Sequence, residues 1–153
     1  MAFDGLFLHF LLEEIKENIE GKKIYKIVPI NDTNYLFVLS SKTNLLINVN
    51  PGTSHIRLTN KEYMPSNSIL SVYLKKHIEG GLINSIKQYK NDRVVILNIF
   101  SKDELGYKKE YNIILELMGK NSDLIICDEN LNILEAIKKS YLTDEHLIKT
   151  GIK

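Results

Sequence analysis

The sequence predicts an α+β fold: an antiparallel β-sandwich of eight or nine strands in two blocks, with two flanking helices. Three observations predict it. Two stretches carry apolar residues at helical spacing, and eight or nine short runs are rich in β-branched and aromatic residues. Each block of four runs follows one of the two helical stretches, and turn residues separate the runs at intervals of about ten residues. That spacing favours a meander, in which successive strands pair antiparallel.

The first predicted helix covers residues 3–19 and the second covers residues 68–78. In the first, Asp4 can cap the start and Gly21 the end. The second follows Pro65 and ends before Gly80. The apolar positions that predict the face of the first helix toward the core are Leu6, Phe7, Phe10, Leu11, Leu12, Ile15 and Ile19.

The predicted strands fall into two groups on either side of the second helix. The first group is interrupted by turn residues such as Asn31-Asp32 and Pro51-Gly52. The predicted ranges are 23–30, 35–40, 44–49, 55–59, 82–89, 93–101, 109–118 and 123–127, with 133–138 as a possible ninth strand.

Length and composition indicate one soluble domain spanning residues 1–153. Apolar residues make up 44% of the chain and charged residues 25%. Lys and Arg number 20 against 19 Asp and Glu, so no global field attracts nucleic acid or anionic lipid, and any basic site has to be local. The chain shows no signal peptide or membrane segment, which predicts a cytoplasmic protein with no membrane partner. The lone thiol, Cys127, fits a buried strand in a reducing compartment, with a reactive cysteine as the alternative.

No pattern of catalytic or metal-binding residues is present in the sequence. His9, His55, His77 and His146 are scattered, and no cysteine joins them at ligand spacing. We therefore predict no metal, no cofactor and no catalytic residue, and hence no enzyme. His77 lies in a last helical turn, where a partial positive charge suits the helix dipole, and His9 is expected to be a half-buried ring.

Asp92 and Arg93 stand together at the entry to a buried run. Neighbouring strand residues point to opposite faces, so the two side chains cannot form a bidentate pair with each other. One hypothesis is a polar strand entry, and the other is that Arg93 is a ligand-binding fork. The bases near this point outnumber the acids by three, which is typical of either a solvated run or a modest phosphate-contacting face: Lys75, Lys76, Lys87, Lys90 and Arg93 against Glu79 and Asp92.

Five motifs in order, spread over residues 1–139, resemble the N-terminal domain of the NFACT family. They are MAFDGLFLHFLLEEI at the start, LKKHIEGGLINSI, NDR at 91–93, DELG at 103–106 and ELMGK at 116–120. The resemblance implies a fold similar to the N-terminal β-sandwich of formamidopyrimidine-DNA glycosylases. It also implies that the chain is the isolated first domain of a longer multidomain protein, and a monomer.

What the resemblance implies for function is ribosome-associated quality control. The family's full-length proteins bind a large ribosomal subunit carrying an obstructed nascent chain, and they recruit alanyl-tRNA for alanine tailing of that chain. The tRNA-binding motif residues fall on Asp92, Arg93, Glu116, Leu117 and Met118. This chain departs from the family pattern at ELMGKNSD, where the family tends to have ELMGKHSN, and at LKKH, where it has LRKH.

Two alternatives remain open at this point. One is a catalytically inactive relative of the DNA glycosylases, since the chain begins Met1-Ala2-Phe3 and lacks the N-terminal proline that acts as their nucleophile. The other is a surface adhesin for fibronectin or fibrinogen, as an older label of the family suggests.

Overall fold

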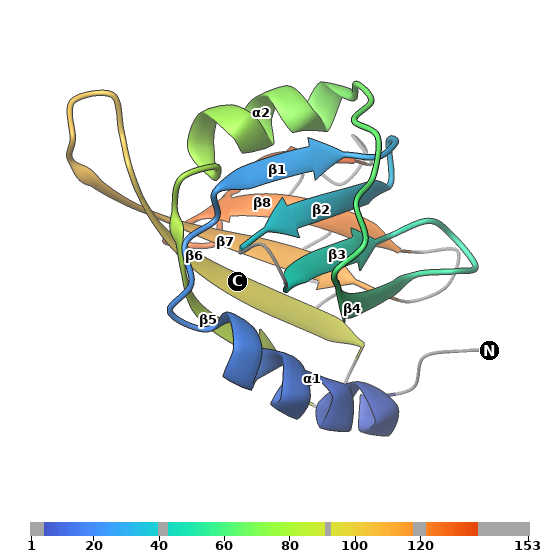
Figure 1. Cartoon of the computed structure of the whole chain (residues 1–153). Helices are drawn as coiled ribbons and strands as arrows, with labels where there is room; N and C mark the ends of the chain where they lie inside the picture. Colours follow the sequence, from blue (N-terminus) through green and yellow to red (C-terminus); the bar gives the residue numbers. More distant parts are fainter. Residues whose placement is uncertain (1–4, 40–42, 91–92, 118–121, 138–153) are drawn as a thin grey trace.

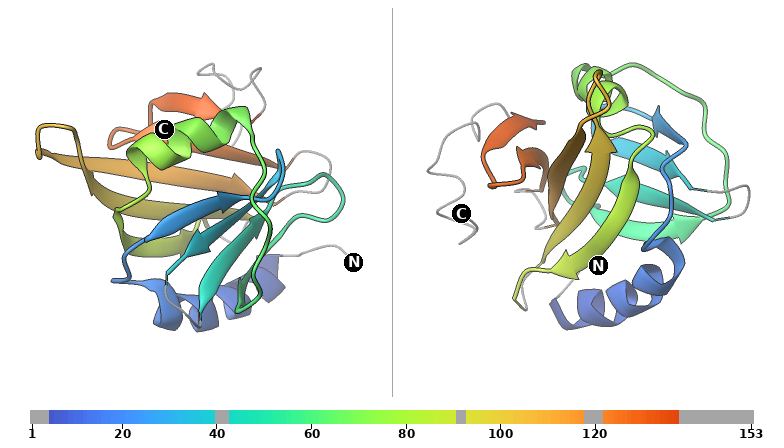
Figure 2. Two further views of the ribbon diagram at one scale, coloured as in Figure 1. Left: turned by 45° about the horizontal axis from the view of Figure 1, so that its top comes forward. Right: turned by 90° about the vertical axis from the view of Figure 1, so that its left-hand side faces the viewer.

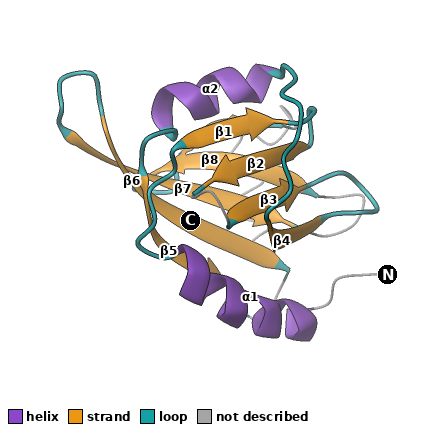
Figure 3. Ribbon diagram, viewed as in Figure 1, coloured by secondary structure: helices purple, strands orange, loops and turns teal. Residues whose placement is uncertain are grey.

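A computed structural model describes residues 5–39, 43–90, 93–117 and 122–137, and it shows two antiparallel sheets packed face to face (Figures 1 and 3). The four-stranded sheet has the order β1-β2-β3-β4 and the five-stranded sheet the order β5-β6-β7-β8-β9. The predicted sandwich and both of its blocks are therefore confirmed. The strands are β1 Lys26–Pro29, β2 Asn34–Val38, β3 Asn44–Asn48, β4 His55–Thr59, β5 Leu82–Gln88, β6 Val94–Lys102, β7 Lys108–Glu116, β8 Asp123–Asp128 and β9 Ile133–Ala136.

Two helices lie beside the sandwich, one at each side (Figure 2). The first, α1 (Gly5–Ile19), packs against β5 and β4. The second, α2 (Ile69–His77), packs against β1 and β9. Ser68 caps α2 by accepting a hydrogen bond from the N–H of Ser71, whose side chain accepts one in return from the N–H of Ser68. Each helix thus closes the gap between an edge of one sheet and an edge of the other.

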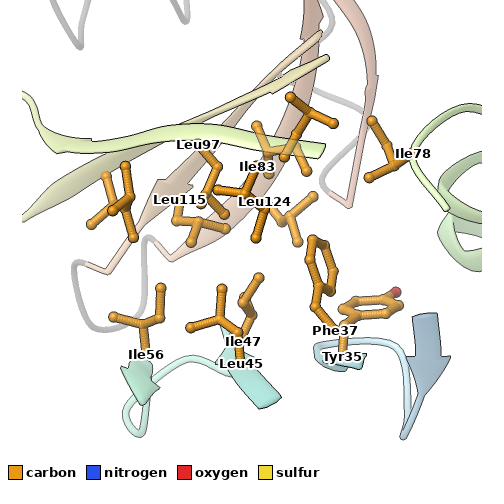
Figure 4. Packing of buried hydrophobic residues seen from close by; sticks show 14 of the residues in the cluster. Tyr35, Phe37, Leu45, Ile47, Ile56, Ile78, Ile83, Leu97, Leu115 and Leu124 are labelled. Carbon is orange, nitrogen blue, oxygen red and sulfur yellow. The ribbon is translucent and has the colours of Figure 1, made fainter. Parts of the chain in front are cut away.

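The main core fills the space between the sheets (Figure 4). Tyr35 and Phe37 of β2 are fully buried there, facing Leu97 of β6 and Leu115 of β7. A second, smaller cluster occupies the outer face of the five-stranded sheet, and it consists of Val94, Ile114, Ile125, Cys127 and Ala136. The five-stranded sheet is therefore apolar on both faces, which explains why its strands read as nearly continuous apolar runs.

The predicted face of α1 is partly wrong. Leu6, Phe7 and Phe10 are exposed, at 68%, 49% and 65% of their surface, and His9 is exposed rather than half-buried. The buried residues are Leu8, Leu12, Ile15 and Ile19. They form a stripe along the whole helix, whereas the exposed apolar residues occupy only its first turns, so the orientation seen buries apolar surface along the full length of α1.

Most element boundaries differ from the predictions by one to three residues. The largest difference is at β1, which starts at Lys26 rather than at residue 23. Arg93 lies in a bend one residue before β6. The predicted cap Asp4 lies outside the described residues, whereas Gly21 ends α1 with a φ of 84° as expected.

The two halves of the chain contact each other through two matching backbone segments, and we call this contact the joint. The segments IEGKKIYKI (19–27) and IEGGLINSI (78–86) cross where Lys23 pairs with Leu82. Each hydrogen bond of one segment has a counterpart in the other. The N–H of Gly21 donates to the carbonyl of Ile83, and the N–H of Gly80 donates to the carbonyl of Ile24, both at 2.7 Å. Likewise, the N–H of Ile24 donates to the carbonyl of Gly81 at 2.7 Å, and the N–H of Ile83 donates to the carbonyl of Lys22 at 2.9 Å. Such matching is typical of a contact with two-fold symmetry.

The correspondence extends into both sheets. The pairs Tyr35↔Ile47 in one sheet and Val95↔Leu115 in the other occupy matching positions of the core. The N–H of Val49 donates to Thr33 C=O, and the N–H of Leu117 donates to Arg93 C=O, each at 2.9 Å. The domain therefore consists of two structurally similar halves. The first half is α1 with β1–β4, the second is α2 with β5–β8, and β9 is an additional strand of the second half.

Candidate nucleic-acid interface

Arg93 lies at one end of the five-stranded sheet, where β6 begins and β7 ends, and we call this end of the two strands the Arg93 corner. Its backbone carbonyl accepts the hydrogen bond from the N–H of Leu117, and the next residue, Val94, lies directly opposite Glu116. The fold thus brings together three of the predicted RNA-binding residues from distant parts of the sequence: Arg93, Glu116 and Leu117. The other two, Asp92 and Met118, lie outside the described residues.

The three residues differ in exposure. Arg93 is half-buried, whereas Glu116 exposes 1% of its surface and Leu117 none. Leu117 belongs to the main core, so it anchors the corner. Glu116 lies between Val94 and Asp123 in register, and residues opposite one another in a sheet share a face. Arg93 is therefore the one of the three with surface available to a large ligand.

Tyr89 and Lys90 add an aromatic ring and a second cation beside this corner. The N–H of Tyr89 donates to the carbonyl of Val94 at 2.8 Å, and the Lys90 Nζ lies 5.3 Å from the centre of the Tyr89 ring. Lys90 has a φ of 54°, an uncommon conformation for a residue other than glycine. A guanidinium, an ammonium and a phenol ring on one turn are groups that bind phosphates and stack on bases. Lys90 was among the bases counted from the sequence, whereas Tyr89 was not predicted as a site residue. The available signal was the pair YK just before NDR.

The basic residues of the 75–93 stretch do not form one surface. Lys75 and Lys76 belong to α2, which packs on β1 and β9, whereas Lys87 belongs to β5, which packs on α1. The Glu79 carboxylate accepts the N–H of Ile27 at 2.8 Å, so it serves the joint between the halves. The local positive charge near Arg93 therefore comes from Lys87 and Lys90 rather than from the helix.

His77 ends α2 as predicted, and its ring packs among aromatic side chains. The ring packs 4.2 Å from that of Tyr73 and its Nδ1 lies 3.1 Å from the Tyr111 hydroxyl. Burial first, and then the nearby charge of Lys76, lower the pKa of His77 below its usual value. The ring is thus part of an aromatic cluster between α2 and β7.

Three other features of the described residues bear on metal binding, membrane insertion and small-ligand binding. No group of three His, Cys, Asp or Glu residues within them could hold a metal ion. Among the described helices, none is both long and apolar enough to cross a membrane. An open cleft of about 650 Å³ lies at the far end of the sheet from Arg93, with Leu82 and Phe100 at its wall and both Lys and Glu residues around it.

This chain is similar in sequence to proteins named as Rqc2 homologs and as a ribosome quality control subunit. The chain is 35% identical over 146 residues to the Rqc2 homolog RqcH of Streptococcus pneumoniae and 33% identical over 139 residues to that of Bacillus subtilis, with 90% and 88% of this chain covered. It is 28% identical over 154 residues to the ribosome quality control complex subunit 2 of Saccharomyces cerevisiae. The matches cover 26%, 24% and 14% of those proteins, so the chain spans about a quarter of the bacterial relatives' length.

Solved structures agree with the fold. The N-terminal part of the fibronectin/fibrinogen-binding protein of Streptococcus suis superposes with a TM-score of 0.84 at 31% identity, covering 90% of this chain and 54% of that one. The fibrinogen-binding protein of Staphylococcus aureus gives 0.80 at 38% identity, covering 90% and 51%. Residues 4–147 match the family model described as NFACT N-terminal and middle domains, and the chain therefore belongs to the NFACT family.

Proposed function

We propose that this domain binds tRNA as part of a ribosome-associated quality control factor. In the full-length protein it recruits alanyl-tRNA to a large ribosomal subunit with an obstructed nascent chain, and thereby supports alanine tailing of that chain in the cytoplasm. The relatives named as RqcH and Rqc2 support the ribosomal context. The domain itself acts by binding and not by catalysis.

The observation that carries this proposal is the corner at Arg93. Its backbone is held by the hydrogen bond from Leu117, whose side chain is buried in the main core. The guanidinium therefore extends from a rigid scaffold, which reduces the entropy lost when it binds a phosphate or a base edge. Tyr89 and Lys90 lie on the adjoining turn and supply stacking surface and charge. Asp92 and Met118 complete the proposed contact, with Glu116 and Leu117 supporting it from within the sheet.

The test is binding of the purified chain to fluorescently labelled tRNA. With few cations at the corner, affinity should be modest and should fall as salt rises from about 50 to 200 mM. Arg93→Ala should weaken binding roughly ten- to a hundredfold, because it removes a charge-assisted contact. A matched control is Arg57→Ala in β4, an exposed arginine of the other sheet. Absence of tRNA binding by the wild-type chain, or equal losses in both variants, would refute the proposal.

The names of the structural relatives favour a second candidate, binding of fibronectin or fibrinogen. The exposed apolar residues of α1, Leu6, Phe7 and Phe10, are the kind of surface a protein partner covers. Immobilised fibronectin and labelled tRNA can be compared on the same preparation. Binding to fibronectin that Arg93→Ala leaves unchanged, with no tRNA binding, would favour this second candidate over the first.

A further inference from the structure

Four residues from different segments form a row across the outer face of the five-stranded sheet, beside the joint. Lys23 pairs with Leu82 of β5, which lies opposite Phe100 of β6. Phe100 in turn lies opposite Glu110 of β7. Residues directly opposite one another in antiparallel strands share a face. The next residue in the chain after each of the four belongs to the main core: Ile24, Ile83, Ile99 and Tyr111. Because neighbours in a strand point to opposite faces, the row itself faces away from the core.

Two aromatic rings are exposed on this face. Phe100 exposes 42% of its surface and Tyr25 exposes 63%, with Leu82 exposed at 39%. The Lys23 Nζ lies 5.2 Å from the centre of the Tyr25 ring, so these two side chains lie on the same side of their segment. Lys23 and Phe100 are two strand spacings apart, about 10 Å. One extended ligand can therefore contact both rings.

A pair of lysines lies next to the row on the same face. Lys102 and Lys108 are directly opposite each other, two residues along β6 and β7 from the pair of Phe100 and Glu110. They stand at the base of the hairpin that projects from the sandwich between β6 and β7 (Figure 1). Like charges directly opposite one another in a sheet repel and destabilise it. A bound anion offsets that repulsion.

Two open clefts meet at the row, and Leu82 lines both of them. The cleft on the Phe100 side has a volume of about 650 Å³ and the cleft on the Tyr25 side about 750 Å³. Five lysines line them against three glutamates: Lys22, Lys23, Lys102, Lys108 and Lys109 against Glu79, Glu110 and Glu129. Two of these carboxylates already accept hydrogen bonds within the domain, that of Glu79 from the N–H of Ile27 and that of Glu110 from the Asn98 side chain at 3.1 Å. The surface is therefore modestly basic.

The joint fixes the backbone that carries these side chains. The N–H of Tyr25 donates to the carbonyl of Val38 at 2.9 Å, and the N–H of Ile24 donates to the carbonyl of Gly81 at 2.7 Å. Phe100 belongs to a strand that is paired on both sides. Rings on such a scaffold lose little entropy when a ligand stacks on them.

We propose that this surface binds single-stranded RNA, with bases stacked on Phe100 and Tyr25 and phosphates held by Lys23, Lys102 and Lys108. Exposed aromatic side chains on an open sheet, flanked by cations, are the groups on which unpaired bases stack. The surface lies about 20 Å along β6 from Val94 and hence from the Arg93 corner. It is a second RNA site, and the inference does not depend on the role proposed for Arg93.

The test is binding of the purified chain to a fluorescently labelled oligouridylate, which has no stable paired structure. Phe100→Leu keeps an apolar contact with Leu82 but removes the ring, so affinity should fall roughly five- to tenfold, the lower part of the range for losing one base–aromatic stack. Tyr25→Leu should cause a similar loss. Phe10→Leu, at an exposed aromatic position of α1, is the matched control and should bind as the wild type does.

The lysines are tested through the salt dependence of the same binding. Replacing both Lys102 and Lys108 by glutamine should weaken binding at low salt and reduce the slope of log affinity against log salt by about 0.7 for each lost phosphate contact. Lys61→Gln, at an exposed position after β4, is the matched control and should leave the slope unchanged. A slope that the double variant leaves at its wild-type value overturns the phosphate contacts.

The remaining outcomes separate this inference from the proposed function. Arg93→Ala should leave oligouridylate affinity unchanged, and a chain that binds oligouridylate but not tRNA refutes the proposed function while this inference stands. Absence of oligouridylate binding, or wild-type affinity in both Phe100→Leu and Tyr25→Leu, overturns the inference. Equal binding of double-stranded RNA, or equal competition by polyglutamate of the same charge, also overturns it, because charge alone then accounts for binding. Should Phe100→Leu melt at lower temperature while the folded protein binds normally, the ring is structural.

Discussion

The carboxylate of Glu79 accepts a hydrogen bond of 2.8 Å from the backbone N–H of Ile27. Glu79 follows α2, and Ile27 belongs to β1, an edge strand of the other half of the domain. Glu20, which follows α1, does the same for Ile86 of the edge strand β5 at 3.0 Å. A glutamate of each half therefore accepts a hydrogen bond from a backbone N–H in an edge strand of the other half. These two N–H groups are hydrogen-bonded within the domain and cannot pair with a strand of another molecule.

Glu79→Ala should destabilise the domain by about 1–3 kcal/mol, because a partly buried N–H loses its acceptor. Glu20→Ala should cost a similar amount, as the contact is reciprocal. Glu13→Ala on the exposed side of α1 is the control and should change the free energy of unfolding little. Urea unfolding measures all three. A loss for Glu79→Ala no larger than for Glu13→Ala would contradict this account of the joint.

Gly81→Ala should also weaken the joint. A Cβ at this position would lie 2.9 Å from a methyl group of Ile99 and 3.0 Å from the carbonyl oxygens of Ile78 and Phe100. Two of these neighbours are backbone atoms that cannot move cheaply, so we expect a loss of about 1–3 kcal/mol. Gly52→Ala is the control, because its Cβ would have no atom within 4 Å. Gly52 has a φ of 89°, so this variant measures only the cost of placing alanine in a left-handed conformation, about 1 kcal/mol. Thermal or urea unfolding that ranks Gly52→Ala as the more harmful would show that the joint tolerates a Cβ.

His77 should make the stability of the domain depend on pH below neutrality. Its folded pKa is lowered by burial and by Lys76 and Lys109, with Glu104 acting in the opposite direction, while the unfolded ring has a pKa of about 6.5. The unfolded chain therefore binds the proton at higher pH than the folded one. Stability is fully present above the unfolded pKa and declines as the pH falls through it toward the folded pKa.

His77→Gln should flatten that decline, whereas His9→Gln, at an exposed position of α1, should leave it unchanged. The measurement is the urea midpoint between about pH 5 and 7.5. If the midpoint of His77→Gln follows the same pH dependence as the wild type, the slope arises from other groups.

Cys127 should react slowly with thiol reagents. Burial, aided by the negative charge of Asp128, raises the pKa of its thiol to about 12. At pH 8 the thiolate is then roughly one part in ten thousand, and the side chain is fully buried in the outer cluster of the five-stranded sheet. Labelling in native buffer should follow opening of the structure and accelerate in urea. Rapid labelling of the native protein would mean that this cluster opens readily.

The strands could be predicted because each is a short apolar, β-branched run between turn residues, and the buried thiol of Cys127 followed from its run. The buried face of α1 could not be predicted, because apolar residues lie on two sides of that helix. Which side is buried depends on the strands that the helix covers. Contacts such as Glu79 with Ile27 join residues far apart in sequence, which periodicity does not reveal. The matching halves left a signal in the repeated IEG and ND, but its meaning depends on the hydrogen bonds.

The family resemblance predicted Arg93, Glu116 and Leu117 as site residues, and the structure assembles them, whereas their difference in burial had no sequence signal. Glu116 and Leu117 end a run that alternates faces, and only the pairing with β6 and β8 shows that both side chains are covered. From the sequence, Asp123 was the first residue of a predicted strand and a departure from the family pattern. Its position opposite Glu116 became visible once the register was known.

Substitutions at Arg93 should separate charge from geometry. Arg93→Lys keeps the positive charge but loses the planar fork, so it should retain most of the salt-dependent part of tRNA binding and lose discrimination between tRNA and an unrelated RNA of equal length. Arg93→Thr removes both and should bind weakly to either. Thr33 occupies the position in the first half of the domain that matches Arg93 in the second half, so Arg93→Thr should leave the melting temperature nearly unchanged. Affinities for the two RNAs at two salt concentrations, together with the melting temperatures, decide the matter. A melting temperature lowered by several degrees, with normal tRNA affinity in the protein that remains folded, would make Arg93 a structural residue of the strand entry.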